Sequence, residues 1–158
     1  KGLVIPRCVK RNTTTAQASV PTSQQAAVWL VLLISSAACA DDSEAVVAAR
    51  DSVNAWLELI DTSQFSESLG RASPVLQNAI TDKSWNRSLR GSRSPLGAVQ
   101  SRKLLGAKFS EDLPGVPQGD YVIFGFASVF ENQDNIIETV TAKKDADGIW
   151  RVAGYFIR

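Results

Sequence analysis

The sequence predicts an α+β fold, with N-terminal helices packed on a curved antiparallel sheet of about four strands. Two observations lead to this prediction. Apolar residues recur at helical spacing between residues 42 and 94, and β-branched and aromatic residues gather in short runs between turn signals after residue 98. Because helices that precede a meander of strands pack on one face of the sheet, and because mid-strand glycines permit bends, we expect a cone-like domain.

The first helix is predicted over Asp42–Asp61. Its large apolar residues share one face and are Val46, Val53, Trp56, Leu57 and Ile60. Thr62 and Ser63 are suited to end this helix and to cap a short second one, which carries Phe65 and Leu69.

Two further helices are predicted before the sheet. Ser73 and Pro74 form a favourable start for the third, because proline is tolerated at the first helical position. Thr81 can cap a fourth helix. This helix must stop before Ser94-Pro95, because a residue that precedes proline disfavours the helical conformation.

The predicted strands are Val99–Phe109, Tyr121–Phe130, Ile136–Lys143 and Ile149–Ile157. Asp147-Gly148 is a hairpin signal between the last two. Simple alternation along the last strand places two sets of side chains on opposite sides. These sets are Trp150, Val152 and Phe156 on one side and Arg151, Ala153 and Tyr155 on the other. Gly125 and Gly154 lie mid-strand, where they can permit a bend or a bulge.

Residues 26–40 have the features of a secretory signal peptide. They are uncharged and mostly apolar, shorter than the about 20 residues of a membrane-spanning helix, and Ala38-Cys39-Ala40 fits the cleavage pattern. We expect export to the periplasm, with residues 1–25 a disordered or misassigned extension and 41–158 a single domain. Lipidation of Cys39 would instead anchor the chain to the membrane, although Ser36 stands where a lipoprotein signal usually has leucine. A buried core helix is the remaining alternative for the apolar run.

Composition excludes several chemistries. The sequence has no histidine, which removes Ser-His-Asp and Cys-His catalysis and nearly every zinc, copper or haem site. Both cysteines, Cys8 and Cys39, precede Asp41, so region 41–158 has neither a thiolate nucleophile nor a disulfide. We therefore expect no cofactor and no metal ion. More acidic than basic residues in the same region argue against a nucleic-acid partner.

Several short motifs follow one another along region 41–158. They are Trp56-Leu57-x-x-Ile60-Asp61, Trp85, Arg93-Ser-Pro95-Leu96-Gly97 with Arg102, Leu113-Pro114-Gly115-x-Pro117-x-Gly119-x-Tyr121, Glu138-Thr139-Val140 and Gly148-x-Trp150-Arg151-Val152-x-Gly154-Tyr155. In this order they resemble a bacterial family known as domain of unknown function 4019. The resemblance implies an exported protein whose cone-like fold is similar to the nuclear-transport-factor-2-like or cystatin-like group. It implies no activity.

The run from Lys83 to Lys108 holds seven basic residues and no acid. Such a run can bind an anionic ligand or an acidic partner, or it can be a solvated face that pairs with acids elsewhere. Arg93 and Arg102 flank a rigid Pro-Leu-Gly segment that can aim both guanidiniums at one point, as a site for a planar carboxylate or phosphate requires. Alternatively, they bind helix carbonyls or Glu138.

Glu138, Arg151 and Tyr155 fall on adjacent predicted strands, where they could line the open face of the sheet. Glu138 and Tyr155 together could perform acid–base chemistry, whereas a cross-strand pair between Glu138 and Arg151 would explain the same residues without catalysis. The candidate ligand-binding residues are therefore Arg93, Arg102, Glu138, Arg151 and Tyr155. The weak candidates for catalysis are Glu138 and Tyr155.

Three functions remain open. The favoured one is a non-catalytic ligand-binding or protein-interaction module of the cell envelope, which takes a small anionic ligand or an envelope protein. The second is an enzyme that uses Glu138 and Tyr155 in a histidine-free site, with Glu138 withdrawn from water in a deep cavity. The third is a structural envelope protein, for example a homodimer formed through a large apolar patch on the sheet.

Overall fold

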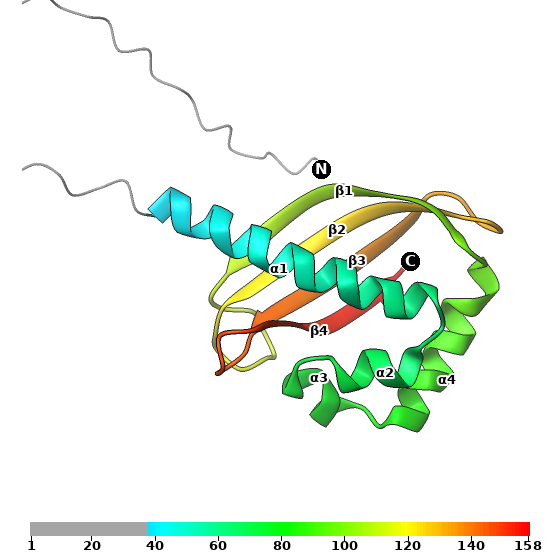
Figure 1. The fold of residues 1–158 in the computed structure, drawn as a ribbon, viewed down its shortest axis with the longest axis horizontal. Coiled ribbons are helices and arrows are strands. Elements are labelled where there is room, and N and C mark those ends of the chain that lie inside the picture. Colours follow the sequence, from blue (N-terminus) through cyan, green and yellow to red (C-terminus); the bar gives the residue numbers. More distant parts are fainter. Residues whose placement is uncertain (1–37) are drawn as a thin grey trace, which may run out of the picture. The chain divides into compact units, whose positions relative to one another are not determined.

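The computed structural model describes residues 38–158, and Figure 1 shows an α+β domain. Four helices precede four strands, as the sequence predicts. The elements are α1 (Ala38–Asp61), α2 (Phe65–Gly70), α3 (Pro74–Ala79), α4 (Asp82–Ser92), a 3-10 turn η1 (Ser94–Leu96), β1 (Val99–Ser110), β2 (Tyr121–Phe130), β3 (Ile136–Lys144) and β4 (Trp150–Ile157). The predicted extension 1–25 and most of the predicted leader lie outside the described residues, although α1 includes Cys39 and Ala40.

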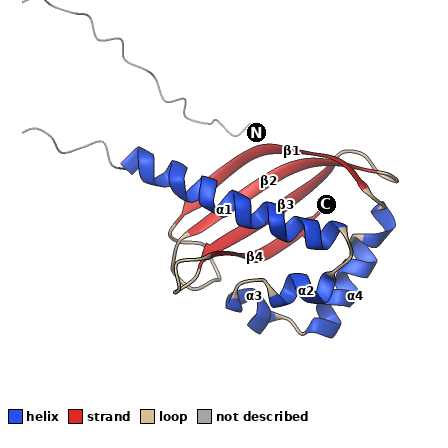
Figure 2. Ribbon diagram, viewed as in Figure 1, coloured by secondary structure: helices blue, strands red, loops and turns tan. Residues whose placement is uncertain are grey.

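The sheet is an antiparallel meander with the strand order β1-β2-β3-β4. Helix α1 crosses one face and contacts all four strands, while α2, α3 and α4 lie together beside its C-terminal half, on the β4 side of the sheet (Figure 2). Each strand of the meander pairs with the next one along the chain, through the loops 111–120, 131–135 and 145–149. The confirmed layer order, helices on one face of the sheet, determines which side chains meet in the core.

The core lies between α1 and the inner face of the sheet. Trp56, Leu57 and Ile60 of α1 pack against Phe124 and other inward residues, and each is almost completely buried. Burying one such side chain contributes roughly 1.5–3 kcal/mol relative to leaving it in water. The rings of Trp56, Trp85 and Tyr155 form a tilted chain, with centroid separations of 6.1 Å and 5.5 Å from Trp56. Among residues 38–158, no helix is long and apolar enough to cross a bilayer.

Two of the predicted helix caps are confirmed. The Ser73 hydroxyl accepts from the Val75 amide, with Pro74 at the first helical position, and the Thr81 hydroxyl accepts from the Ser84 amide. The predicted cap of α2 is wrong, because Thr62 donates its hydroxyl back to the Glu58 carbonyl of α1 at 2.7 Å. Gln64 occupies the N-cap position of α2 and makes no side-chain cap bond.

A β-bulge corrects the predicted alternation of β4. The pairing with β3 shifts between Thr141–Gly154 and Ala142–Val152, so one extra residue is inserted beside Gly154. Beyond the shift every side chain changes face. Tyr155 therefore points into the core rather than away from it, and Phe156, predicted on the core side, is 71% exposed. The sequence indicates that Gly154 can permit a bulge, but it does not predict that the residues after the bulge change face.

Candidate functional site

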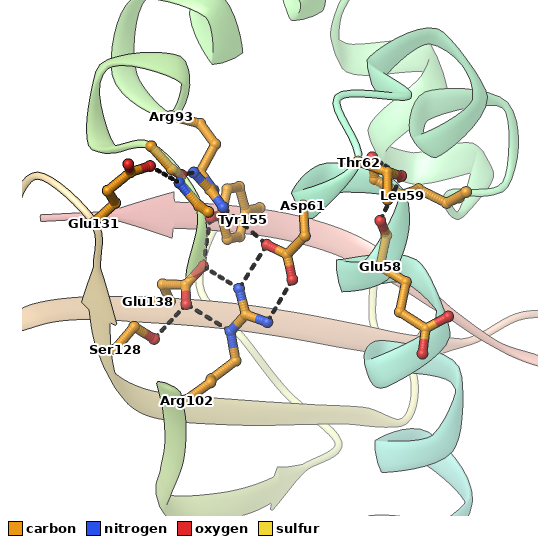
Figure 3. Close-up of polar contacts among 12 residues, drawn as sticks. Glu58, Leu59, Asp61, Thr62, Arg93, Arg102, Ser128, Glu131, Glu138 and Tyr155 are labelled. Carbon is orange, nitrogen blue, oxygen red and sulfur yellow. Dashed lines mark hydrogen bonds and ion pairs between the residues drawn. The ribbon is translucent and has the colours of Figure 1, made fainter. Parts of the chain in front are cut away.

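Arg93 and Arg102 converge on one carboxylate, that of Asp61. Asp61 is the last residue of α1, Arg93 follows the last turn of α4, and Arg102 lies near the start of β1. An Arg93 terminal nitrogen donates to Asp61 at 3.0 Å, and Arg102 donates both of its terminal nitrogens at 2.8 and 3.0 Å (Figure 3). The arginines do aim at one point, as the rigid join suggested, and the anion at that point belongs to the protein.

Glu138 occupies the other side of Arg102. Its side chain is fully buried on β3 and accepts from Arg102 Nε at 2.7 Å and from a terminal nitrogen at 3.2 Å. The Tyr155 hydroxyl donates to it at 2.6 Å, and the Ser128 hydroxyl makes a short hydrogen bond to it. We refer to Asp61, Arg93, Arg102, Ser128, Glu138 and Tyr155 as the charged cluster. The two negative charges of its carboxylates balance the two positive charges of its guanidiniums, and buried charges are usually paired in this way.

The register of the sheet builds this cluster. Arg102 lies directly opposite Ser128 across the β1–β2 pair, and both face inward. Glu138 is inward on the adjacent strand, opposite Phe126. The bulge of β4 then turns Tyr155 toward the same place. Four strands thus deliver one inward polar side chain each beneath the end of α1.

Burial and charge act against each other in the cluster. Burial by itself would raise the pKa of Asp61, but hydrogen bonds and charges from Arg102 and Arg93 outweigh it and hold that pKa below its ordinary value. Burial likewise works to lower the pKa of Arg102, yet its bonds to Asp61 and Glu138 raise it. The pKa of Tyr155 is raised, first by burial and then by the charge of Glu138. At neutral pH, Asp61 and Arg102 are therefore charged and Tyr155 keeps its proton.

The geometry leaves little room for acid–base chemistry at Glu138. A general base needs a lone pair directed at a substrate proton. Both oxygens of Glu138 already accept hydrogen bonds from Arg102. Each oxygen accepts a second hydrogen bond, one from the Ser128 hydroxyl and the other from the Tyr155 hydroxyl. The hydroxyl proton of Tyr155 is directed at the same carboxylate. The bonds between these groups account for their burial without a substrate.

Arg93 is held by more than its ion pair. One terminal nitrogen of Arg93 donates to the Gly97 carbonyl at 2.7 Å. This bond is of the kind expected for an arginine that binds carbonyls near the end of a helix. Its guanidinium lies 4.3 Å from the ring centroid of Phe130, in the range of a cation–π contact. The side chain is buried, and its Nε has no hydrogen-bond partner among residues 38–158.

Arg151 lies apart from the charged cluster. Its guanidinium donates to Asp145 at 3.0 Å and to Asp147 at 3.0 and 2.7 Å, so the expected pair with Glu138 is not formed. The Asp147-Gly148 turn folds both aspartates back onto the strand that follows. Hydrogen bonds from Arg151 and from the Ile149 amide lower the pKa of Asp147 to about 2.

The basic run divides into two kinds of residue. Arg93 and Arg102 turn inward to the charged cluster. The others have exposed side chains on α4 and β1, and these are Lys83, Arg87, Arg90, Lys103 and Lys108. The basic residues of the run therefore do not converge on one anion site. Its exposed members form a solvated surface, which is the alternative to an anion-binding run given above.

An open groove lies between α1 and the start of β4. It has a volume of about 480 Å³, and its lining comes from α1, from the end of α2 and from the β3–β4 turn with β4. The lining residues are Ser52, Ala55, Trp56, Gly70, Arg71, Ile149, Trp150, Arg151 and Val152. We call it the α1–β4 groove. Of the predicted ligand residues it contains only Arg151.

A second hollow of about 340 Å³ lies between α1 and the sheet at β1 and β2. Arg102 lines it together with Arg50, Glu58 and Phe126. The Arg102 side chain is 15% exposed, so this hollow gives water access to one edge of the guanidinium. Its charged groups are of both signs, which favours neither an anion nor a cation.

Sequence reasoning overlooked Asp61 and Ser128. A signal existed for each. Asp61 ends a helix, where the dipole disfavours a negative charge, so an acid there calls for cationic neighbours. Ser128 interrupts the inward row of aromatic residues on β2, and a buried hydroxyl needs a hydrogen-bond partner. Both signals indicate an internal polar site rather than a surface one.

Comparison with known proteins gives one finding. The family described as "Protein of unknown function (DUF4019)" matches residues 52–155, which include every member of the charged cluster and every lining residue of the groove. A search of curated proteins found no match. Within residues 38–158, no group of three potential metal ligands of the His, Cys, Asp or Glu type comes together. The side chain of Cys39, the candidate lipidation site, is outside the described part.

Proposed function

The chain belongs to the DUF4019 family of proteins of unknown function, and we propose that its domain is a non-catalytic binding module that acts outside the cytoplasm. The observation that carries the proposal is the contrast between the two candidate regions. Donors and acceptors of the charged cluster are directed at one another, whereas the α1–β4 groove opens apolar and polar side chains to solvent. Binding sites combine a mainly apolar lining with a few polar groups in this way.

The charged cluster supports this function as a scaffold. It ties the end of α1 to β1 and, through Glu138, to β3 and β4. The same helix lines the groove with Trp56, and the same last strand lines it with Trp150 and Val152. A fixed crossing of α1 over β4 therefore fixes the width of the groove. Such preorganisation lowers the cost of binding.

Native mass spectrometry of the full chain isolated from its own host tests the binding function. We expect a non-covalently bound small molecule that is displaced when the groove is altered at the exposed Ile149, as in Ile149→Glu. The matched control is Val47→Glu, which changes another exposed β-branched aliphatic residue, outside the groove. An empty protein, together with no thermal stabilisation by any of a broad set of small molecules, would contradict the proposal.

Export is the second part of the proposal and rests on the leader-like residues 26–40. The architecture of helices on a curved sheet is also compatible with kinship to the nuclear-transport-factor-2-like group. Cell fractionation and the intact mass of the mature chain test export. Cleavage after Ala40 gives a chain that starts at Asp41, whereas lipidation gives a heavier chain that starts at Cys39. An uncleaved chain in the cytoplasm would refute this part.

A further inference from the structure

We propose that the outer edge of β1 binds an extended acidic segment of a partner protein, which pairs with it as a fifth strand of the sheet. This surface lies at the other edge of the sheet from β4, which lines the α1–β4 groove, so the inference goes beyond the proposed function and does not depend on it. Three observations carry it: the open backbone edge of β1, the bulge that aligns two lysines on one face, and the charge of that face.

The two edge strands of the sheet differ in how they are covered. At β4 the Ser73 amide donates to the Val152 carbonyl at 2.8 Å, and α3 packs beside the strand. Among residues 38–158, the outer edge of β1 has no backbone partner of this kind (Figure 1). Seven of the twelve residues of β1 are exposed, against one of eight in β4. An open edge of this length presents amides and carbonyls with which another extended chain can pair.

The bulge in β1 places two lysines on one face. Lys103 and Lys108 are five residues apart, a spacing that regular alternation would divide between the two faces of the sheet. The pairing with β2 shifts between them, so Lys103 lies opposite Ala127 and Lys108 lies opposite Ile123. These two β2 residues alternate with the buried aromatic residues and lie on the face away from α1. Both lysines therefore lie on that outer face, beside β2 positions that are four residues apart.

The outer face around the two lysines is positively charged. Both side chains are exposed, and neither forms an ion pair in the part of the chain that the structure describes. Beside them, the outer positions of β2 and β3 hold alanine, isoleucine and threonine. Leu105, at the bulge between the lysines, is 55% exposed. Two uncompensated positive charges on either side of an apolar residue favour a partner with two carboxylates.

A second copy of this chain fits the edge poorly. Antiparallel pairing of two β1 strands about a two-fold axis would bring two copies of Lys103 and two of Lys108 onto one shared face, and β1 itself contains no acid. Like charges on adjacent strands are destabilising. The lysines therefore oppose self-pairing and favour a strand whose carboxylates face them. The expected partner segment carries two acids four residues apart.

Three capped, labelled peptides test this inference by fluorescence anisotropy with the full chain. TVEVTVEVT carries its two glutamates four residues apart, on one face of a strand. Its isomer TVEVTEVVT carries them three apart, on opposite faces, and TVKVTVKVT reverses the charge. We expect the first to bind about threefold more tightly than its isomer and at least about tenfold more tightly than the lysine peptide. Equal affinity of the two isomers would show charge attraction without strand pairing and would overturn the proposal.

Hydrogen exchange shows whether the peptide pairs with the backbone. TVEVTVEVT should slow the exchange of β1 amides at least about tenfold and leave that of β4 amides unchanged, because only β1 gains hydrogen bonds. Bound peptide without protection of β1 would refute the pairing. Protection of β1 that rises with protein concentration in the absence of peptide would assign the edge to a second copy instead, and would also overturn the proposal.

Two double variants test the charges. Lys103→Gln with Lys108→Gln should weaken the binding of TVEVTVEVT roughly tenfold, because both charge pairs are removed. The matched control is Lys83→Gln with Arg87→Gln, at exposed basic residues of α4, which removes the same net charge and should leave the affinity unchanged. An equal loss in both double variants would mean that the net charge of the protein, rather than the β1 edge, attracts the peptide, and would contradict the site.

Leu105→Glu tests the centre of the site. A negative charge between the two lysines would repel the peptide carboxylates and should abolish binding. Val47→Glu makes a matched change at an exposed aliphatic residue of α1 and should leave binding intact. Both positions are exposed, so both variants should fold. Undiminished binding by Leu105→Glu would refute the assignment.

Discussion

The domain contains two arrangements in which one arginine lies between two acids, and they differ mainly in the burial of one of the acids. Arg102 lies between Asp61 and Glu138 beneath α1, where its side chain is 15% exposed and that of Glu138 is fully buried. Arg151 lies between Asp145 and Asp147 at the β3–β4 turn, where Asp147 is about half exposed. The hydrogen-bond lengths are similar. Water therefore screens the pair of Arg151 with Asp147 and is largely excluded from the pair of Arg102 with Glu138. Asp61 and Asp145 are both largely buried, with side chains 18% and 9% exposed.

The largest expected effect comes from removing the central arginine. Arg102→Met leaves Glu138 buried without a cation and Asp61 with Arg93 alone, and should lower the free energy of unfolding by about 3–5 kcal/mol. Urea denaturation of the full chain measures this. Arg151→Met is the matched control and should cost far less, because Asp147 can be hydrated and Asp145 keeps its hydrogen bond from the Ser73 hydroxyl. Equal losses would mean that burial does not distinguish the two sets.

Tyr155→Phe should have the next largest effect. It deletes one hydrogen bond to a buried carboxylate while keeping the ring against Trp56, so we expect a loss of about 1.5–3 kcal/mol. Urea denaturation at pH 7 again provides the measurement. A neutral result would indicate that Glu138 is satisfied by Arg102 and Ser128 alone.

The same tyrosine predicts how stability falls in alkali. The pKa of Tyr155 is raised in the folded state by burial and by Glu138, so its contribution is complete below about pH 10, where the unfolded phenol titrates, and is lost as pH rises above it. Tyr155→Phe should therefore flatten the alkaline decline. Some decline should remain, because burial also raises the pKa of Tyr121. An unchanged decline in the variant would contradict this assignment.

Acid should distinguish the two acid–arginine sets by salt. The pKa values of Asp61 and Asp147 are both lowered in the folded state, so each contributes stability above about pH 4 that is lost as pH falls further. At high salt the contribution of exposed Asp147 should disappear while that of Asp61 persists. The slopes of stability against pH for Asp61→Asn and Asp147→Asn, each at low and at 1 M salt, check this. Equal salt sensitivity would contradict it.

The smallest expected effect is that of Arg151→Gln. The melting temperature should fall by no more than about 3 °C at low salt, because exposed ion pairs contribute little. At high salt the difference should vanish. Differential scanning calorimetry at both salt concentrations provides the measurement, and a shift that survives salt would assign Arg151 a packing role instead.

Much of the fold could be predicted because its signals are local. Ser73-Pro74 and Thr81 specify helix starts by the chemistry of their own side chains, and Asp147-Gly148 specifies a hairpin. The direction of Tyr155 could not be predicted in the same way. It depends on an inserted residue in the pairing of two strands, and a period of two carries no information about where that period is interrupted.

The candidate site was predictable in part for a related reason. Arg93 and Arg102 were expected to converge, because a rigid segment joins them, but their target comes from a helix far earlier in the chain. Glu138 and Tyr155 were expected to be neighbours and are. Arg151 was grouped with them because alternation gave it the same face as Tyr155, and the bulge separates the two. Long-range partners of charged residues require tertiary structure.

The bulge of β4 has a further consequence for how the register of the last strand is specified. A slip of one residue would return Phe156 to the core and Tyr155 to water, and Glu138 would then be buried with one donor fewer. Apolar packing alone distinguishes these registers poorly, since both offer an aromatic ring. The charged cluster distinguishes them well, because an under-satisfied buried carboxylate is costly. It joins the end of the first helix to the last strand, so it closes only when both are in place. The charged cluster therefore helps to specify the register of the final strand, because a slipped register leaves the buried Glu138 with one hydrogen-bond donor fewer.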